Sequence, residues 1–159
     1  MKKVLTALIL LLLLVIPSIS YAQSEASPSA EVKVEYESIN PDSIFYPLKR
    51  TWEKFYLMIQ FTENGRKEYM QKLIDIRFKE LVYIAKNQKL SEFKQASSRY
   101  NSVIGEYTGK FSNTKDKIGQ SAKSYSNILG ELRKQYDSDF AYWSFLKSSQ
   151  ETSQELENN

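Results

Sequence analysis

The sequence predicts an all-α protein, an antiparallel helical bundle or elongated helical hairpin of three to four helices that follows a signal peptide. Apolar residues recur at three- and four-residue steps through most of the chain after residue 47, which is the spacing of amphipathic helices. The connections between these segments are short, which favours antiparallel neighbours. The chain contains no cysteine, so packing alone must hold the fold together.

The first 22 residues have the three parts of a secretory signal peptide. Lys2 and Lys3 give a positive start, an apolar run follows over 4–16, and small residues precede a predicted cut between Ala22 and Gln23. An uncleaved anchor would need roughly 20 apolar residues to span a bilayer, and this run is shorter. We therefore expect an extracytoplasmic protein, periplasmic, at the cell surface or secreted, that meets a membrane only through an uncleaved signal.

Removal of the signal changes the charge balance. The chain has 22 basic and 19 acidic residues, and the loss of Lys2 and Lys3 leaves a net charge of +1. The remaining 137 residues fit one domain with a core of reasonable size. Because phosphate-backbone binding needs clustered Lys and Arg, nucleic acid is not an expected partner.

The composition divides the exported part into three. Residues 23–40 are mostly small and polar and predict a flexible linker or arm, in which Val32, Val34 and Tyr36 alternate without a partner strand. Residues 41–147 form the predicted helical domain. Residues 148–159 are almost entirely Ser, Thr, Gln, Glu and Asn, and predict a disordered polar tail.

The first predicted helix covers about 47–61, with Pro47 in its first turn, where the missing amide hydrogen costs little. A large aromatic and aliphatic stripe lies on one of its faces: Leu48, Trp52, Phe55, Tyr56 and Ile59. Residues 62–65 end in Asn-Gly, which predicts a tight reversal of the chain.

The second predicted helix covers about 66–86. Its inner face consists of Met70, Leu73, Ile74, Phe78, Leu81 and Ala85. A short break follows at 87–90, after which Ser91 is a natural N-cap for a third helix that reaches Phe111. The apolar stripe of this third helix consists of Phe93, Ala96, Tyr100, Val103, Ile104, Tyr107 and Phe111.

A fourth helix is predicted after a cap at Asn113 or Thr114. Its apolar positions are Ile118, Ala122, Tyr125, Leu129, Leu132 and Tyr136. The sequence leaves open whether 114–147 forms one helix or two, although the phase of the apolar residues over 140–146 favours continuity. Asp137 and Asp139 are the densest acidic pair, and a helix cap or solvated turn explains them better than a cation site does.

Residues 40–54 and the following Phe61-Thr62 resemble a known family. They have the Pro-Asp-Ser, Tyr-x-x-Lys-Arg and Trp-Glu pattern of the domain of unknown function 5667 family, and Arg77-x-x-Glu80 is similar to its Arg-x-x-Glu step. The resemblance covers about 35–132 and implies an exported helical domain with no assigned activity. This chain has Tyr69 and Met70 where many members carry a His.

The residue inventory excludes several kinds of chemistry. The sequence has no His, no Cys and no glycine-rich phosphate loop, which excludes His-based triads, thiol catalysis and the usual zinc, iron–sulfur and nucleotide sites. No catalytic, metal-binding or cofactor-binding residue is therefore predicted, and no cofactor. The remaining acids along the helices are interpreted as solvated charges: Glu53, Glu63, Glu68, Asp75 and Glu80.

The opening of the first helix supplies the best candidate site. The candidate interaction residues are Tyr46, Lys49, Arg50, Trp52 and Glu53. The alternative is a capped helix start in which Lys49 or Arg50 pairs with a nearby acid. Arg77 and Glu80, three residues apart on one helix, predict a structural ion pair.

The chain is rich in aromatic residues, with 11 Tyr, 8 Phe and 2 Trp. Helical spacing favours a core position over a ligand-binding one for five of them: Trp52, Tyr100, Tyr107, Tyr125 and Trp143. The favoured function is a non-enzymatic protein-interaction module, a sensor, adaptor or chaperone-like element whose partner is another envelope or secreted protein. The alternative is a structural protein that contacts cell-wall glycan or lipid through exposed aromatics, and an enzyme comes third.

Three observations would separate these functions. Partner binding predicts an exposed apolar stripe on the folded bundle, glycan binding predicts coplanar exposed rings in a groove, and catalysis predicts a cleft with converging acids. The oligomeric state is left open by the sequence.

Overall fold

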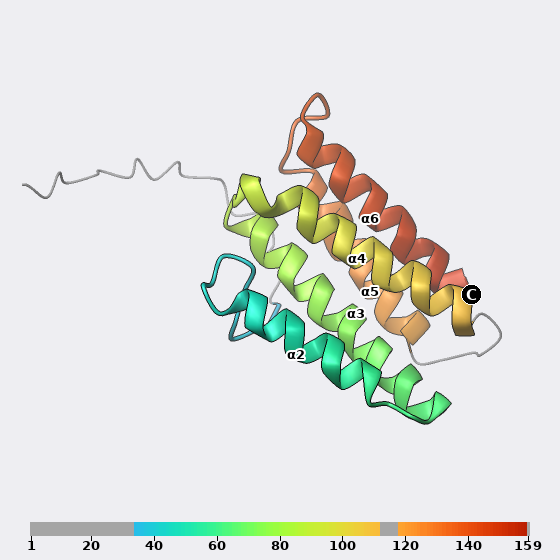
Figure 1. The fold of residues 1–159 in the computed structure, drawn as a ribbon. Helices are drawn as coiled ribbons and strands as arrows, with labels where there is room; N and C mark the ends of the chain where they lie inside the picture. Colours follow the sequence, from blue (N-terminus) through green and yellow to red (C-terminus); the bar gives the residue numbers. More distant parts are fainter. Residues whose placement is uncertain (1–33, 112–117, 159) are drawn as a thin grey trace, which may run out of the picture. The chain divides into compact units, whose positions relative to one another are not determined.

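The computed structural model describes residues 34–111 and 118–158. Labelled as in Figure 1, its helices are α2 (Tyr46–Met58), α3 (Glu63–Lys86), α4 (Leu90–Phe111), α5 (Ile118–Arg133) and α6 (Ala141–Asn158). These described ranges contain no strand, so the prediction of an all-α fold is confirmed. The described residues form five helices rather than the three to four that were expected.

Several predictions concern residues outside the described ranges. They include the signal peptide over 1–22, its cut between Ala22 and Gln23, most of the linker, and the cap at Asn113 or Thr114. The described end of the linker lies on the helical domain. Val34 packs against the core, and the rings of Tyr36 and Tyr83 meet edge to face at 5.4 Å between centroids.

Helices α3, α4, α6 and α5 form a four-helix bundle in which each helix contacts two others. Consecutive helices run antiparallel, and α2 lies along α3 outside the bundle (Figure 1). None of the described helices is both long enough and apolar enough to cross a membrane. The bundle therefore carries the core, and α2 is an addition to one side of it.

The predicted inner faces of α3, α4 and α5 supply the core. All six residues predicted for the inner face of α3 are buried. On α4 and α5 the buried apolar residues are Phe93, Ala96, Tyr100, Ile104, Tyr107, Ala122, Tyr125, Leu129 and Leu132. The helical periodicity thus identified most of the core of α4 and α5 and about two thirds of that of α3, where Ile76, Val82 and Ile84 are buried as well without having been predicted. Among the predicted core aromatics Tyr100, Tyr107 and Tyr125 are buried.

Helix α5 ends at Arg133, before α6 begins at Ala141. The amides of Gln135 and Tyr136 donate to the carbonyls of Leu132 and Arg133, three residues back, which tightens the last turn and ends the helix. Residues 134–140 are turns, and the described part of 114–147 thus forms two helices rather than the continuous one that the apolar phase favoured. The two acids predicted to occupy a solvated turn, at 137 and 139, lie exposed in this connection.

Helix α6 reaches Asn158, where the sequence predicted a disordered tail from residue 148. Four residues on one face of the helix are buried: Leu146, Ser149, Ser153 and Leu156. The two serines are small enough to let α6 approach α4, and their hydroxyls find partners there. Ser149 Oγ lies 2.8 Å from Ser97 Oγ, and Ser153 Oγ lies 2.8 Å from the hydroxyl of Tyr100. A face that looks polar in the sequence is therefore a packed, hydrogen-bonded interface.

The reversal between α2 and α3 lies earlier than Asn64-Gly65. Thr62 is the N-cap of α3, and its side chain accepts a hydrogen bond from the amide of Gly65 at 3.1 Å. Glu63 then stands in the first turn, where the helix dipole favours a negative charge. Because a threonine cap and an acidic first turn favour a helix start, Asn64 and Gly65 continue into the helix instead of breaking the chain.

Because Tyr100 and Tyr125 are buried, we expect the free energy of unfolding to fall at alkaline pH. Burial raises the pKa of Tyr100, and burial together with the charge of Asp75 raises that of Tyr125. Each tyrosine therefore keeps its proton to a higher pH when folded than when unfolded. This stabilisation is complete below about pH 10, and the free energy of unfolding falls above it by up to about 1.4 kcal/mol per pH unit for each tyrosine.

Urea unfolding between about pH 8 and 11.5 measures this slope. Tyr100→Phe should make the dependence on pH shallower by up to one proton. Ser153→Ala is the matched control, because it removes the hydrogen bond of Tyr100 and leaves the titrating group in place. Equal slopes in the wild type and in Tyr100→Phe would contradict the prediction.

Candidate functional site

Helix α2 turns its polar face toward the bundle. Its buried residues are Tyr46 and Glu53. The hydroxyl of Tyr46 donates to Glu80 Oε2 on α3 at 2.8 Å, and Lys49 Nζ donates to Glu80 Oε1 at 2.9 Å. The contact of α2 with the bundle therefore has buried hydrogen bonds and charges at its centre, and Leu57 packs against the core beside them.

Arg77 lies at the centre of this contact. Its Nη1 is 2.7 Å from both carboxylate oxygens of Glu80, and its Nη2 bonds Glu53 Oε2. Burial by itself would lower the pKa of Arg77, but the charges of Glu80 and Glu53 outweigh it and raise the pKa. Glu53 and Glu80 were predicted to be solvated charges, and this is wrong, because both are buried against one guanidinium.

The arm and α4 complete the cluster. Lys49 Nζ lies 3.6 Å from Glu37 Oε2 and donates to the carbonyl of Ile39 at 3.0 Å, which ties the arm to α2. The guanidinium of Arg99 on α4 lies over the ring of Tyr46 at 5.2 Å. Burial, followed by the charge of Glu80, raises the pKa of Tyr46, so its hydroxyl stays protonated and continues to donate.

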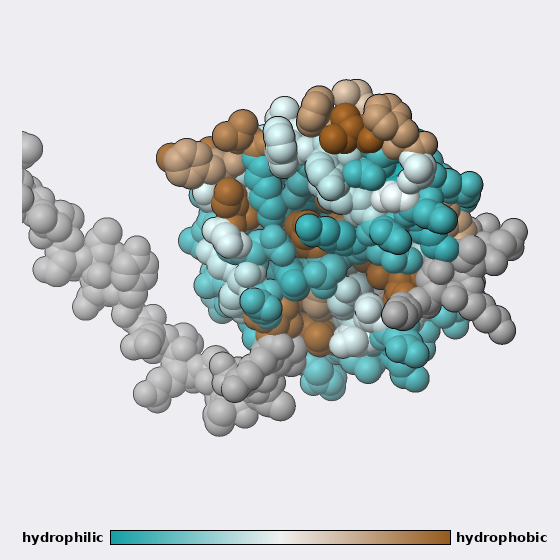
Figure 2. Space-filling model, turned by 90° about the horizontal axis from the view of Figure 1, so that it is seen from below, coloured by the Kyte–Doolittle hydropathy of each residue, from teal (hydrophilic) through white to brown (hydrophobic). Residues whose placement is uncertain are grey.

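The opposite side of α2 is apolar and exposed. Trp52 is 65 % exposed and Leu48 is 70 % exposed, so the prediction that Trp52 fills the core is wrong. We call the following residues the α2 outer face: Phe45, Leu48, Trp52, Phe55 and Ile59. In Figure 2, which views the molecule from the side where α2 lies in Figure 1, apolar atoms gather along the upper edge. The polar contacts with α3 and the arm are what orient the helix this way.

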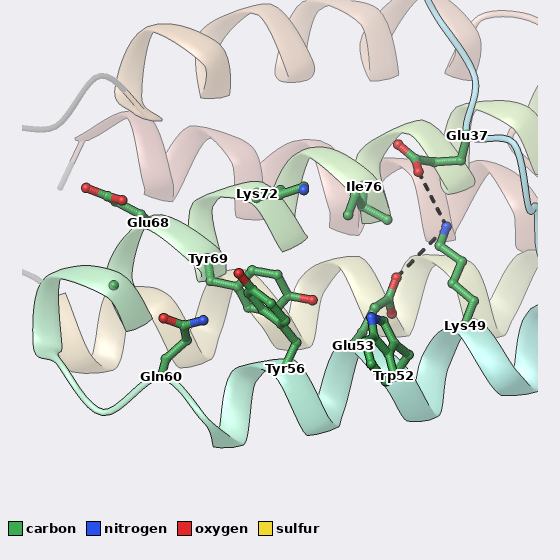
Figure 3. Close-up of a pocket in the computed structure, with 11 residues that line it drawn as sticks. Glu37, Lys49, Trp52, Glu53, Tyr56, Gln60, Glu68, Tyr69, Lys72 and Ile76 are labelled. Carbon is green, nitrogen blue, oxygen red and sulfur yellow. Dashed lines mark ion pairs between the residues drawn. The ribbon is translucent and has the colours of Figure 1, made fainter.

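A groove of about 570 Å³ runs between α2 and α3, next to the α2 outer face (Figure 3). Trp52, Tyr56 and Tyr69 line it together with charges of both signs, including Glu68 and Lys72. The rings of Tyr56 and Tyr69 lie 4.7 Å apart between centroids and are inclined by 48°. The groove therefore has aromatic surfaces, but its two tyrosine rings are not coplanar.

The described residues hold no group of three or more His, Cys, Asp or Glu side chains that could bind a metal ion. The two acids that converge, Glu53 and Glu80, are both engaged by Arg77. The cluster is thus suited to holding α2 in place.

The structure separates the five candidate interaction residues into three groups. Tyr46, Lys49 and Glu53 face inward and meet Arg77 and Glu80, while Trp52 lies on the outer face. Arg50 lines a different hollow between α2, α3 and α4. The sequence analysis missed Glu37, Tyr69 and Arg99, since no spacing pattern links them to residues on α2.

Together, the fold and this site define a four-helix domain with one further helix, α2, which contacts the bundle through polar side chains and exposes an apolar face. The chain belongs to the family named Domain of unknown function (DUF5667), whose model matches residues 38–158. Comparison with curated proteins gave no match, and comparison with solved structures gave none either. The expected family membership is confirmed, and the match extends to the end of α6, beyond the segment that carried the resemblance.

Proposed function

We propose that this protein is an exported, non-enzymatic interaction module that binds another envelope or secreted protein through the α2 outer face. The observation that supports this proposal is the orientation of α2, whose polar side is buried and whose apolar side is exposed. A helix held only by packing would bury its apolar side, because burial of apolar area is the main favourable term. Here the buried charges of Glu53, Arg77 and Glu80 reverse that preference and leave the apolar face available.

The size of the exposed surface supports the same proposal. Added together, the α2 outer face and its exposed neighbours Ile44, Met58 and Phe61 expose an apolar area on the order of 1,000 Å², since large apolar side chains carry roughly 150–250 Å² each. A standard interface buries about 800 Å² on each partner, so this surface is large enough for one.

Ring geometry favours a protein partner over a glycan. Sugar rings stack on flat, coplanar aromatic surfaces, whereas the rings of Trp52 and Phe55 are inclined to each other by 34°. The mixture of aliphatic and aromatic side chains resembles the centre of a protein interface, where aromatic residues and Met are enriched. The expected partner therefore presents an apolar surface of its own.

The test compares two variants in cells that produce the protein. Leu48→Gln/Trp52→Gln/Phe55→Gln makes the α2 outer face polar, and Leu90→Gln/Phe140→Gln makes the same kind of change at two apolar residues that are exposed elsewhere. Crosslinked neighbours are identified by mass spectrometry, and binding is then measured with the purified partner. We expect the first variant to lose binding by at least a hundredfold, on the order of 3 kcal/mol, and the control to retain it.

Circular dichroism must show that both variants keep the helical content of the wild type. Retained partner binding in the first variant would overturn the proposal, as would recovery of the wild type only as a free monomer. Vesicles and cell-wall fragments are tested in parallel. If vesicles or cell-wall fragments bind the wild type and not the first variant, the α2 outer face contacts lipid or glycan, and the alternative function applies.

A further inference from the structure

A second hollow lies between α2, α3 and α4, separate from the α2 outer face. It has a volume of about 280 Å³, just below the roughly 300–1,000 Å³ of pockets for drug-sized ligands. Its walls combine apolar side chains such as Leu73 and Val103 with charged groups from all three helices. The size suits a small ion or a single chemical group.

The lining has more positive than negative charge. The cations are Arg50, Lys54, Arg77 and Arg99, and the anions are Glu53 and Glu106. Both anions already have partners, since Glu53 bonds Arg77 and Glu106 lies 2.6 Å from Lys110. Within the ranges that the structure describes, no carboxylate lies at ion-pair distance from Arg50 or Lys54. The pocket thus contains cations that the protein itself does not neutralise.

Two of the three guanidinium nitrogens of Arg99 lack a hydrogen-bond acceptor. Its Nη1 donates to Gln95 Oε1 at 3.2 Å, but Nε and Nη2 are buried without an acceptor. The ring of Tyr46 stabilises the charge of Arg99 but offers no conventional acceptor. A buried donor without a partner is unfavourable, because it has lost its hydrogen bonds to water without replacement. Burial, followed by the charge of Arg77, lowers the pKa of Arg50.

We propose that this pocket binds a tetrahedral oxyanion, a phosphate or sulfate group, between Arg50 on α2 and Arg99 on α4. Guanidinium groups match oxyanions because their planar N–H donors engage two oxygens at once. Ser98 and Ser102, one helical turn apart on α4, line the same pocket and add two hydroxyl donors. Two guanidiniums and two hydroxyls offer more donors than the two oxygens of a carboxylate accept, which favours a group with three or four oxygens.

The oxyanion can come from solution or from a lipid headgroup, and the experiment separates the two. The purified protein is titrated with inorganic phosphate, sulfate and acetate at constant ionic strength, maintained with chloride. Binding is followed through the NMR signals of the arginine Nε–H groups. We expect saturable shifts of the Arg50 and Arg99 signals with phosphate and sulfate, and at least tenfold weaker binding of acetate.

Three variants test the assignment. R50Q and R99Q should each weaken phosphate binding about tenfold or more, because each removes a charge-assisted contact. R133Q is the matched control, since Arg133 lies over the ring of Trp143 outside the pocket, and it should bind as the wild type does. If R99Q fails to fold, R50Q still tests the proposal, since no hydrogen bond or ion pair of the cluster around Arg77 involves Arg50.

Shifts that rise linearly without saturation, equal binding of acetate, or unchanged binding in R50Q would each overturn the proposal. Vesicles of phosphatidylcholine with and without phosphatidylglycerol complete the test. Binding that requires phosphatidylglycerol and is lost in R50Q supports a lipid headgroup as the source. Saturable binding of phosphate with no preference for phosphatidylglycerol supports a soluble one. Neither result depends on the partner proposed for the α2 outer face.

Discussion

Arg77→Met is expected to lower the free energy of unfolding by about 3–5 kcal/mol, the typical cost of removing one partner from a buried ion pair. Arg77 is 4 % exposed and lies between the carboxylates of Glu53 and Glu80. Without the guanidinium, Lys49 is the one cation left at ion-pair distance from these two negative charges among the described residues, and it serves Glu53 only at 3.9 Å. The two carboxylates must then either bind protons or draw α2 away from α3 to reach water.

Urea denaturation followed by circular dichroism measures the effect. Lys72→Met is the matched control on the same helix, where the side chain is exposed, and it should change stability by no more than about 0.5 kcal/mol. The triple variant Glu53→Leu/Arg77→Met/Glu80→Leu should regain part of the loss, because it leaves no unpaired charge among the three and Lys49 keeps Glu37 and the carbonyl of Ile39 as partners. A loss below about 1 kcal/mol in Arg77→Met would show that the cluster does not depend on its central cation.

Phe93→Ala is expected to lower the free energy of unfolding by about 3–5 kcal/mol, the usual cost of deleting a large buried side chain and leaving a cavity. Phe93 is fully buried at the start of α4. Its ring lies 5.7 Å from that of Tyr136 and 5.3 Å from that of Tyr142, so it joins α4 to the connection between α5 and α6 and to α6 itself.

Phe61→Ala is the matched control for Phe93→Ala, since the same side chain is deleted at a site that is 93 % exposed. It should change the free energy of unfolding by no more than about 0.5 kcal/mol. Thermal and urea unfolding of both variants would check the pair. Similar losses at the two positions would contradict the assignment of Phe93 to the core and of Phe61 to the surface.

Sequence periodicity was reliable where a helix packs on the bundle through apolar side chains. The inner faces predicted for α3, α4 and α5 are buried because transfer of apolar side chains such as Met70, Tyr100 and Leu129 from water into a shared core is favourable. For α6 the same approach failed. Its buried Ser149 and Ser153 look like solvent-exposed residues until Ser97 and Tyr100 are seen to satisfy their hydroxyls.

The candidate site could be predicted only in part. The motif at the start of α2 and the step from Arg77 to Glu80 were found from spacing and resemblance. Their meeting could not be predicted, because Glu53 and Arg77 are 24 residues apart and belong to different helices. The contribution of Arg99, on a third helix, leaves no pattern in the sequence at all.

The sequence by itself determined that this chain is helical, most of the residues that form the core of α3 to α5, and which family it belongs to. Only the tertiary structure decided which side of α2 faces inward. Periodicity shows that a helix has an apolar and a polar side, and burial of the apolar side is the ordinary outcome. Here the charges of Glu53, Arg77 and Glu80 complement one another in three dimensions, and this match buries the polar side and leaves the apolar one exposed.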